Sequence, residues 1–286
     1  MNTNLIYDVG MYDGSDTEHY LKKGYTVIAV EADPALVTKA TGKFSRYIQK
    51  GKLKIINSGI AKENGFADFF INEVNPFWNS FDESITAREN LPYHKIKIKT
   101  IRFEEILKEH GVPFYLKVDI EGNDHLCLDA LDARDLPTYV SFEADNIGNI
   151  EPLYALKHLG YNRFKCINQN NFLSIDETYT TENDLSKLKA KDRFYFNLMT
   201  DNILPYKIVR RVIGRDLFTK FLNPPYHLRY RKGSSGPFGD ELGGDWLSYE
   251  GVKELYYKSY ESYQKMGILN DYSFWCDFHA AKFTHI

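Results

Sequence analysis

The chain has 286 residues, of which 43% are hydrophobic and 26% charged, and its net charge is −3 with a pI near 6.3. This composition is typical of one large or two modest globular domains, and it argues against the basic field that nucleic-acid binding requires. The sequence shows neither a signal-like leader nor an apolar run long enough to span a membrane, so we expect a cytoplasmic protein. Cys127, Cys166 and Cys276 are scattered without CxxC spacing and are expected to be buried thiols.

Short apolar runs alternate with helix-like segments along the first 170 residues. This alternation predicts right-handed crossovers and a mostly parallel sheet covered by helices on both faces. The expected strands are 5–8, 25–31, 53–57, 66–71, 96–101, 114–120, 139–144 and 163–167, and the expected helices are 16–23, 34–49, 103–110, 123–131 and 150–159.

The pattern changes after about residue 170, where charged and aromatic residues, prolines and a glycine-rich stretch at 233–239 replace the alternation. Helices are plausible at 208–222 and 249–266, and 272–278 again resembles a strand. We therefore expect an α/β core over 1–170 and 271–286, interrupted by a helical and irregular insert over 171–270.

The segment from Asp8 to Gly14 reads as the end of a strand, a glycine turn and the start of a helix. Such a turn presents backbone N–H groups and a positive helix end to a polar ligand. Gly10 and Gly14 do not form the GxGxxG pattern that cradles a dinucleotide pyrophosphate. The spacing therefore favours a nucleoside ligand without phosphates.

Acidic residues follow several of the predicted strands. Glu31 lies 23 residues after Asp8, where a carboxylate can accept both ribose hydroxyls of a nucleoside. Asp119, Glu121, Glu143 and Asp145 follow two later strands. The alternative role for Glu143 and Asp145 is capping of a helix, which for Asp145 is as simple an explanation as a role in the site. Because parallel strands end at the same edge of a sheet, we expect Asp8, Glu31, Asp119 and Glu121 to face one crevice, with Glu143 at the end of the neighbouring strand.

Three motifs together resemble the FkbM family of S-adenosylmethionine-dependent methyltransferases: Asp8–Gly14, the Glu-Ala-Asp-Pro that begins at Glu31, and Leu-Lys-Val-Asp-Ile-Glu-Gly ending at Gly122. The resemblance covers about residues 5–145, and the late Gly-Ser-Ser-Gly-Pro-Phe-Gly and Trp-Cys-Asp-Phe-His-Ala segments are also similar to some members. The chain departs from the family at Met11-Tyr12, where Ala-Asn is usual, and at Asp124, where Glu is common. The resemblance implies a Rossmann-like class I fold with a seven-stranded, mostly parallel sheet and an antiparallel last strand.

The resemblance also implies where S-adenosylmethionine would bind. Asp8, Gly10 and Gly14 would surround its methionine part, Glu31 would hold the ribose, and Asp119 would lie near the amine and the methyl centre. The full set of cofactor-side residues implied in this way is Asp8, Gly10, Tyr12, Gly14, Ser15, Glu31, Ala32, Ser58, Ser80 and Asp119.

Methyl transfer to a hydroxyl requires the acceptor oxygen to be held close to the methyl group and to lose its proton. Glu121 or Glu143 could take that proton. Alternatively, Asp119, Glu143 and Asp145 could bind a magnesium ion that acidifies the hydroxyl. The sequence leaves both roles open.

The insert is expected to cover the site and to bind substrate, because the sequence begins directly with the first strand and offers no preceding cap. The alternatives are a solvated arm or a dimer contact. The proposed substrate contacts are Tyr226, Arg229, Arg231, Lys232, Trp246 and the loop 233–239, whereas His279 is expected to be structural.

The sequence thus predicts an O-methyltransferase that acts on a hydroxyl of a sugar, a glycan or a secondary metabolite. The expected partner is this small-molecule or glycan substrate rather than nucleic acid or a membrane, with a homodimer as an option. The main alternative is a degenerate methyltransferase-like binding module in which Tyr12 blocks the cofactor. A nicotinamide-dependent oxidoreductase is disfavoured by the glycine spacing.

Overall fold

The computed structural model describes residues 2–144, 150–169, 172–175, 234–265 and 274–283. The chain divides into two compact units. The first comprises Met1–Asn162 with Ala280–Ile286, and the second comprises Arg163–His279.

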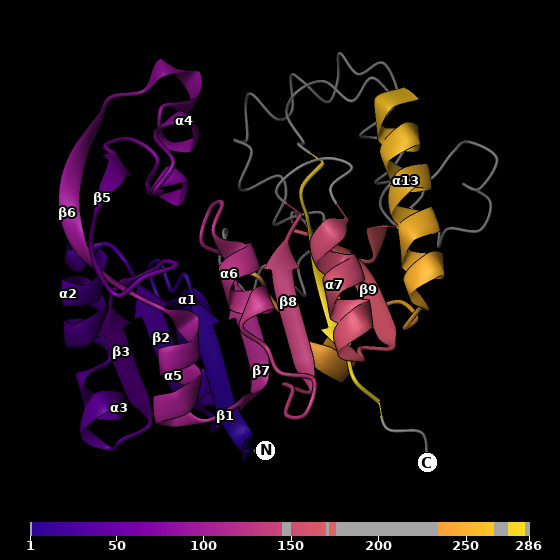
Figure 1. Cartoon of the computed structure of the whole chain (residues 1–286), viewed down its shortest axis with the longest axis horizontal. Helices are drawn as coiled ribbons and strands as arrows, with labels where there is room; N and C mark the ends of the chain where they lie inside the picture. The colour runs from indigo at the N-terminus through magenta and orange to yellow at the C-terminus, as the bar shows by residue number, and fades with distance from the viewer. Residues whose placement is uncertain (1, 145–149, 170–171, 176–233, 266–273, 284–286) are drawn as a thin grey trace, which may run out of the picture. The chain divides into compact units, whose positions relative to one another are not determined.

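Five parallel strands form the sheet of the first unit (Figure 1). Their order is β3 (Leu53–Asn57), β2 (Thr26–Glu31), β1 (Asn2–Val9), β7 (Pro113–Val118) and β8 (Tyr139–Glu143). Val9 pairs with both Val30 and Val118, so the carboxyl ends of the three middle strands are level. Side chains that follow these strands therefore emerge at one edge of the sheet.

Helices cover this sheet, and α5, α6 and α7 lie in a row in front of it in Figure 1. Tyrosines fill much of the interior: Tyr7, Tyr20 and Tyr115 are fully buried. Their polar ends need partners, and Tyr115 lies 2.6 Å from the Ser141 hydroxyl. Several of the 21 tyrosines of the chain therefore lie in the core. Outside residues 59–101, the helices described in the first unit are α1 (Ser15–Lys22), α2 (Pro34–Lys43), α3 (Ser45–Gln49), α5 (Phe103–His110), α6 (Asp124–Asp129) and α7 (Glu151–Leu159).

The prediction of one continuous helix over 34–49 is wrong, because the segment forms α2 and α3 with a break at Phe44. Phe44 has φ −102° and ψ 15°, outside the helical range. Its ring is buried against Gly14 of the glycine turn. Burial of this aromatic ring gives a reason for the break that helical periodicity does not reveal.

Residues 59–101 form what we call the arm, which carries a separate three-stranded sheet in the order β4-β6-β5. The strands are β4 (Gly59–Ile60), β5 (Gly65–Asn72) and β6 (Tyr93–Ile101), and they are joined by η1 (Pro76–Trp78), α4 (Glu83–Thr86) and η2 (Arg88–Asn90). β5 and β6 pair in antiparallel fashion over their length. The two additional strands predicted at 66–71 and 96–101 are confirmed, but they belong to this separate sheet.

The described part of the second unit contains β9 (Arg163–Asn168), η4 (Gly239–Glu241), α13 (Tyr249–Lys265) and most of β10 (Cys276–Ala281). Phe164 and Leu247 exchange two backbone hydrogen bonds of 2.9 Å. Tyr256 of α13 is fully buried, with its ring 5.0 Å from that of Phe278. The three cysteines are free and buried, as expected.

The complete main sheet has seven strands in the order β3-β2-β1-β7-β8-β10-β9. Asn162 N–H donates to the carbonyl of Ala281, and Gln169 N–H donates to that of Trp275. Because the partner numbers fall as the donor numbers rise, β10 runs antiparallel to β9. The predicted α/β fold with an antiparallel last strand is confirmed.

The predicted position of that last strand, 272–278, is wrong: β10 begins at Cys276 and continues to Ala281. Asp277 and His279 are polar, yet both are buried within the strand. A polar residue after an apolar run suggests the end of a strand. For this reason the prediction stops before His279, although β10 continues to Ala281.

Candidate active site

Two glycines fix the turn between β1 and α1. Gly10 has φ +84° and Gly14 has φ +75°, a backbone conformation that L side chains rarely adopt. A Cβ atom on Gly10 would overlap the backbone oxygen of Asp119. The N–H groups of Gly10 and Met11 both donate to the carbonyl of Val30 at 3.0 Å. The turn is therefore held against the ends of β2 and β7.

Asp8 and Lys117 brace this turn from inside the protein. Asp8 is fully buried; its Oδ2 accepts a hydrogen bond of 2.6 Å from the Thr17 hydroxyl, and its Oδ1 lies 3.3 Å from Lys117 Nζ. Lys117 Nζ also donates to the carbonyl of Gly10 at 2.8 Å and lies 3.6 Å from Asp119 Oδ2. Burial lowers the pKa of Lys117, but the nearby Asp8 and Asp119 carboxylates outweigh it and raise that pKa well above its usual value. The ammonium group thus stays charged and links three site segments.

Glu31 lies at the end of β2, beside the turn. Its Oε2 accepts a hydrogen bond of 2.8 Å from Tyr12 N–H, and its Oε1 accepts one of 2.9 Å from Asp33 N–H. Burial raises the pKa of Glu31 from 4.5 to about 7, although the two backbone N–H groups oppose the shift. The neighbouring Ala32 is partly exposed, and its carbonyl accepts a hydrogen bond of 3.2 Å from Asn57 Nδ2. The Glu31 carboxylate is thus fixed in orientation, with each oxygen retaining a lone pair for another donor.

Tyr12, the third residue of the turn after Val9, adopts φ +52°. Its ring lies 4.4 Å from that of Phe77, centre to centre, so a residue of the arm packs on the turn. Asp13 Oδ1 accepts hydrogen bonds from the backbone N–H and the hydroxyl of Ser15 at 2.8 and 2.5 Å. No sequence pattern indicates that Phe77 belongs beside this turn.

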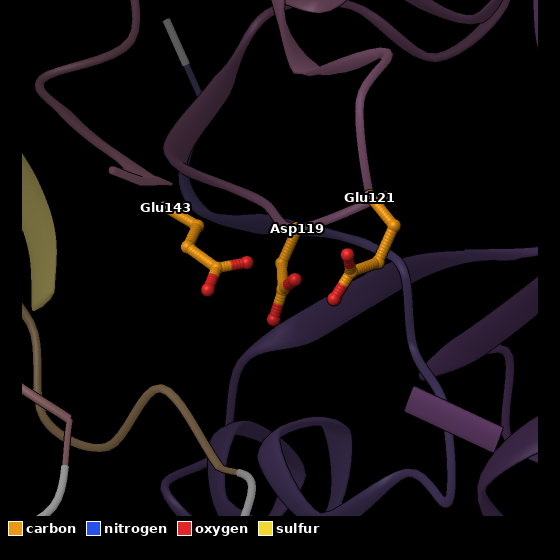
Figure 2. A group of neighbouring side chains, drawn as sticks. All are labelled: Asp119, Glu121 and Glu143. Atoms are coloured by element: carbon orange, nitrogen blue, oxygen red, sulfur yellow. The ribbon is translucent and has the colours of Figure 1, made fainter. Parts of the chain in front are cut away.

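Asp119, Glu121 and Glu143 come together after β7 and at the end of β8. Figure 2 shows Asp119 between the other two, with the three carboxylates directed to the same side. One oxygen from each lies within 4.8 Å of the others. Arg88 Nη1 lies 3.6 Å from Glu121 Oε2, and Lys117 balances Asp119. Asp119 and Glu121, two of the carboxylates predicted to face one crevice, thus lie beside Glu143, whereas no such grouping includes Asp8 or Glu31 among the described residues.

Ser58 and Ser80 are both buried, and both donate hydrogen bonds to backbone carbonyls around the site. Ser58 N–H donates to the carbonyl of Glu31 at 3.1 Å, and its hydroxyl donates to that of Asn57. The Ser80 hydroxyl donates to the carbonyl of Glu121 at 2.7 Å. Both serines thus lie close to the predicted segments, and direct contact with a cofactor stays a prediction for each.

Most of the predicted substrate contacts fall on residues that the structure does not describe. Tyr226, Arg229, Arg231 and Lys232 are outside the described residues, as is the expected helix at 208–222. Trp246 lies in the second unit, where its ring is 4.7 Å from Lys165 Nζ.

His279 is buried in β10. Burial, reinforced by the charge of Lys165, lowers the pKa of His279 to about 3, so its imidazole is neutral near pH 7. A buried neutral ring inside a strand agrees with the structural role expected for it.

Among the residues whose placement is described, none lies in a helix long and apolar enough to cross a membrane.

The model of the Methyltransferase FkbM domain matches residues 8–163, which is more than half of the chain and includes the whole site described above. The chain belongs to the FkbM methyltransferase family. This family implies S-adenosylmethionine as the methyl donor. No curated protein matches the FkbM chain described here.

Several solved structures are similar to this FkbM protein. Methyltransferase FkbM from Methylobacillus flagellatus KT is 16% identical, with a TM-score of 0.37, and the match covers 54% of this chain and 37% of that one. The precorrin-6y C5,15-methyltransferase from Geobacter metallireducens GS-15 is 12% identical over 58% of this chain and 66% of its own, with a TM-score of 0.34. A TehB-like SAM-dependent methyltransferase from Corynebacterium glutamicum ATCC 13032 Kitasato is 9% identical over 58% and 70%, with a TM-score of 0.32.

Proposed function

We propose that this FkbM protein is an S-adenosylmethionine-dependent O-methyltransferase that methylates a hydroxyl group of a sugar, a glycan or a secondary metabolite. The observation that carries the proposal is the fixed Glu31 carboxylate beside the glycine turn. Its two backbone hydrogen bonds orient it and leave acceptor capacity for the paired hydroxyls of a ribose. A cytoplasmic location and a homodimer remain predictions.

The residues present suit a sulfonium nucleoside. Gly10 permits close approach of the backbone, and Asp119 offers a partly exposed carboxylate to an ammonium group. S-adenosylmethionine supplies an electrophilic methyl group, and the protein must hold the acceptor oxygen in line with it. We infer that the insert over 171–270 holds that acceptor, with Tyr226, Arg229, Arg231 and Trp246 as its first candidates.

Calorimetric titration with S-adenosylhomocysteine tests the cofactor assignment without knowledge of the acceptor. We expect the wild type to bind and Glu31→Ala to lose measurable binding, because the ribose hydroxyls lose their acceptor. Glu31→Gln keeps one oxygen acceptor and the side-chain shape, so it separates loss of the carboxylate from local collapse. Glu104→Ala, which removes an exposed glutamate of α5, is the matched control and should bind as the wild type does.

Two results would contradict this assignment. Unchanged affinity in folded Glu31→Ala would remove Glu31 from the ribose site. Absence of any heat or thermal shift in the wild type would favour the alternative of a non-catalytic module, in which Tyr12 and Phe77 close the site.

We further propose that the Asp119, Glu121 and Glu143 carboxylates act on the acceptor proton. Either Glu121 or Glu143 accepts it, or the cluster holds a divalent cation, such as Mg²⁺, that acidifies the hydroxyl. In both cases Asp119→Asn should retain the fold and lose about a hundredfold or more in turnover, measured as S-adenosylhomocysteine released with acceptor present. Full activity of Asp119→Asn would remove this residue from the mechanism.

The two roles differ in their dependence on a cation. Titration of Mn²⁺ followed by electron paramagnetic resonance requires no acceptor. Binding that Glu143→Gln abolishes would assign the cluster to a cation, whereas activity that persists in EDTA would assign it to proton transfer.

A further inference from the structure

The arm has one packed face and one open face. On the packed face, Phe69 and Ile98 are buried, and the ring of Phe81 lies 5.1 Å from that of Phe69. α4 contacts β5 and lies on the inner side of the arm in Figure 1. Because side chains alternate along a strand, the residues between the buried ones point to the opposite face, which we call the outer arm face.

The outer arm face combines lysines with aromatic rings. Lys95, Lys97 and Lys99 follow one another at alternate positions of β6, so their Cα atoms are about 7 Å apart. On the neighbouring strand, Phe66 pairs with Lys99 and Phe70 with Lys95. The face thus offers a row of ammonium groups beside two rings, and it ends at Tyr93, whose hydroxyl donates to Glu83 of α4 at 2.5 Å.

This face carries net positive charge on an acidic protein. Asp68 is the one carboxylate in the ladder between these lysines; it lies opposite Lys97 in the register and forms an ion pair with Lys95 at 2.9 Å. Within the described part of the chain, Lys97 and Lys99 have no carboxylate at ion-pair distance, and both are exposed. The chain as a whole has a net charge of −3, so a polyanion would be attracted to this face more than to the average surface.

The outer arm face also exposes apolar side chains to solvent. Phe66 is 71% exposed, and Tyr93 is 37% exposed. Rings that stand beside charged groups on an open sheet are suited to ligands that have flat apolar faces and acidic groups in alternation.

We propose that the outer arm face binds an acidic glycan, with its carboxylate or sulfate groups on Lys97 and Lys99 and its sugar rings on Phe66 and Phe70. The inference rests on the proposed function and deepens it, because it assigns the acceptor to the class of acidic polysaccharides: the arm would bind one stretch of the glycan while the insert holds the sugar unit whose hydroxyl is methylated. Single-stranded nucleic acid fits less well, since its dense phosphates are bound by more extended positive grooves than two unpaired lysines provide.

Calorimetry with an oligogalacturonate as the acidic probe tests the proposal on the full chain, with neither methyl donor nor turnover required. We expect the wild type to bind it, to bind a neutral malto-oligosaccharide of equal length less tightly, and to lose affinity as salt is raised. Lys97→Glu/Lys99→Glu should weaken binding about tenfold or more, because two attractions become repulsions. Phe66→Ser should weaken it about threefold through loss of ring contact.

Lys39→Glu/Lys50→Glu is the matched control: it makes the same charge change at exposed lysines of the same unit that are not part of the arm, and should stay within about twofold of the wild type. Absence of wild-type binding, equal affinity in the Lys97→Glu/Lys99→Glu variant, or equal loss in the control would overturn the proposal. Tighter binding of an oligothymidylate of equal charge would assign the face to nucleic acid instead. Titration of the same samples with S-adenosylhomocysteine reports separately on the proposed function.

Discussion

At the level of single residues, Gly10 determines how closely the glycine turn approaches β7. Its φ of +84° could be tolerated by another residue at some cost, but the backbone oxygen of Asp119 occupies the position of a Cβ atom. The neighbour is backbone, so it cannot move aside as a flexible side chain would. The turn and the carboxylate cluster are therefore coupled through this contact.

We expect Gly10→Ala to lower the free energy of unfolding by about 3 kcal/mol or more, because it adds steric overlap to backbone strain. Gly24→Ala is the control, since Gly24 has a similar φ of +93° but no atom within 4 Å of the point where a Cβ would lie. It should cost about 1 kcal/mol from backbone strain alone. Urea unfolding measures both values, and equal costs in the two variants would show that the contact with Asp119 is not limiting.

Sequence patterns identified the carboxylates of the site but not the groups that hold them. Glu31 and Asp119 were predicted from their positions after strands, and the structure places them beside the turn. Lys117 was part of a recognised motif, and a lysine inside an apolar strand signals a buried partner, yet which carboxylate it meets depends on strand order. The contact of Phe77 with Tyr12 had no signal, because it joins segments 65 residues apart that have no shared pattern.

At the level of elements, the parallel strands and crossover helices follow from apolar runs, since those runs are buried on both faces. What the periodicity lacks is information on tertiary partners. The break between α2 and α3 depends on the Phe44 ring, which packs against Gly14 of the glycine turn. β10 continues through Asp277 and His279, and both of these polar residues are buried in the folded chain. The arm shows the same limit: alternation predicted both strands, whereas only the pairing of β5 with β6 places them in a sheet of their own.

At the level of the whole molecule, two buried groups in different units oppose each other in their effect on stability. The pKa of Glu31 is raised from 4.5 to about 7 by burial, so the folded state binds more protons than the unfolded state between these values. Stability contributed by protonated Glu31 is therefore lost as pH rises through that window. The pKa of His279 is lowered from 6.5 to about 3 by burial and by Lys165, so its effect on stability rises with pH up to about 6.5.

Between about pH 4.5 and 6.5 the two slopes should cancel, each being at most about 1.4 kcal/mol per pH unit. Glu18, whose pKa is lowered to about 2 by Lys22 and Lys43, affects stability only below this window. We expect Glu31→Gln to expose the rise due to His279, and His279→Gln to expose the fall due to Glu31. Urea unfolding from pH 4.5 to 6.5 would show the two variants sloping in opposite directions, with the wild-type profile between them. Parallel profiles for the two variants would contradict the raised pKa of Glu31 and the lowered pKa of His279.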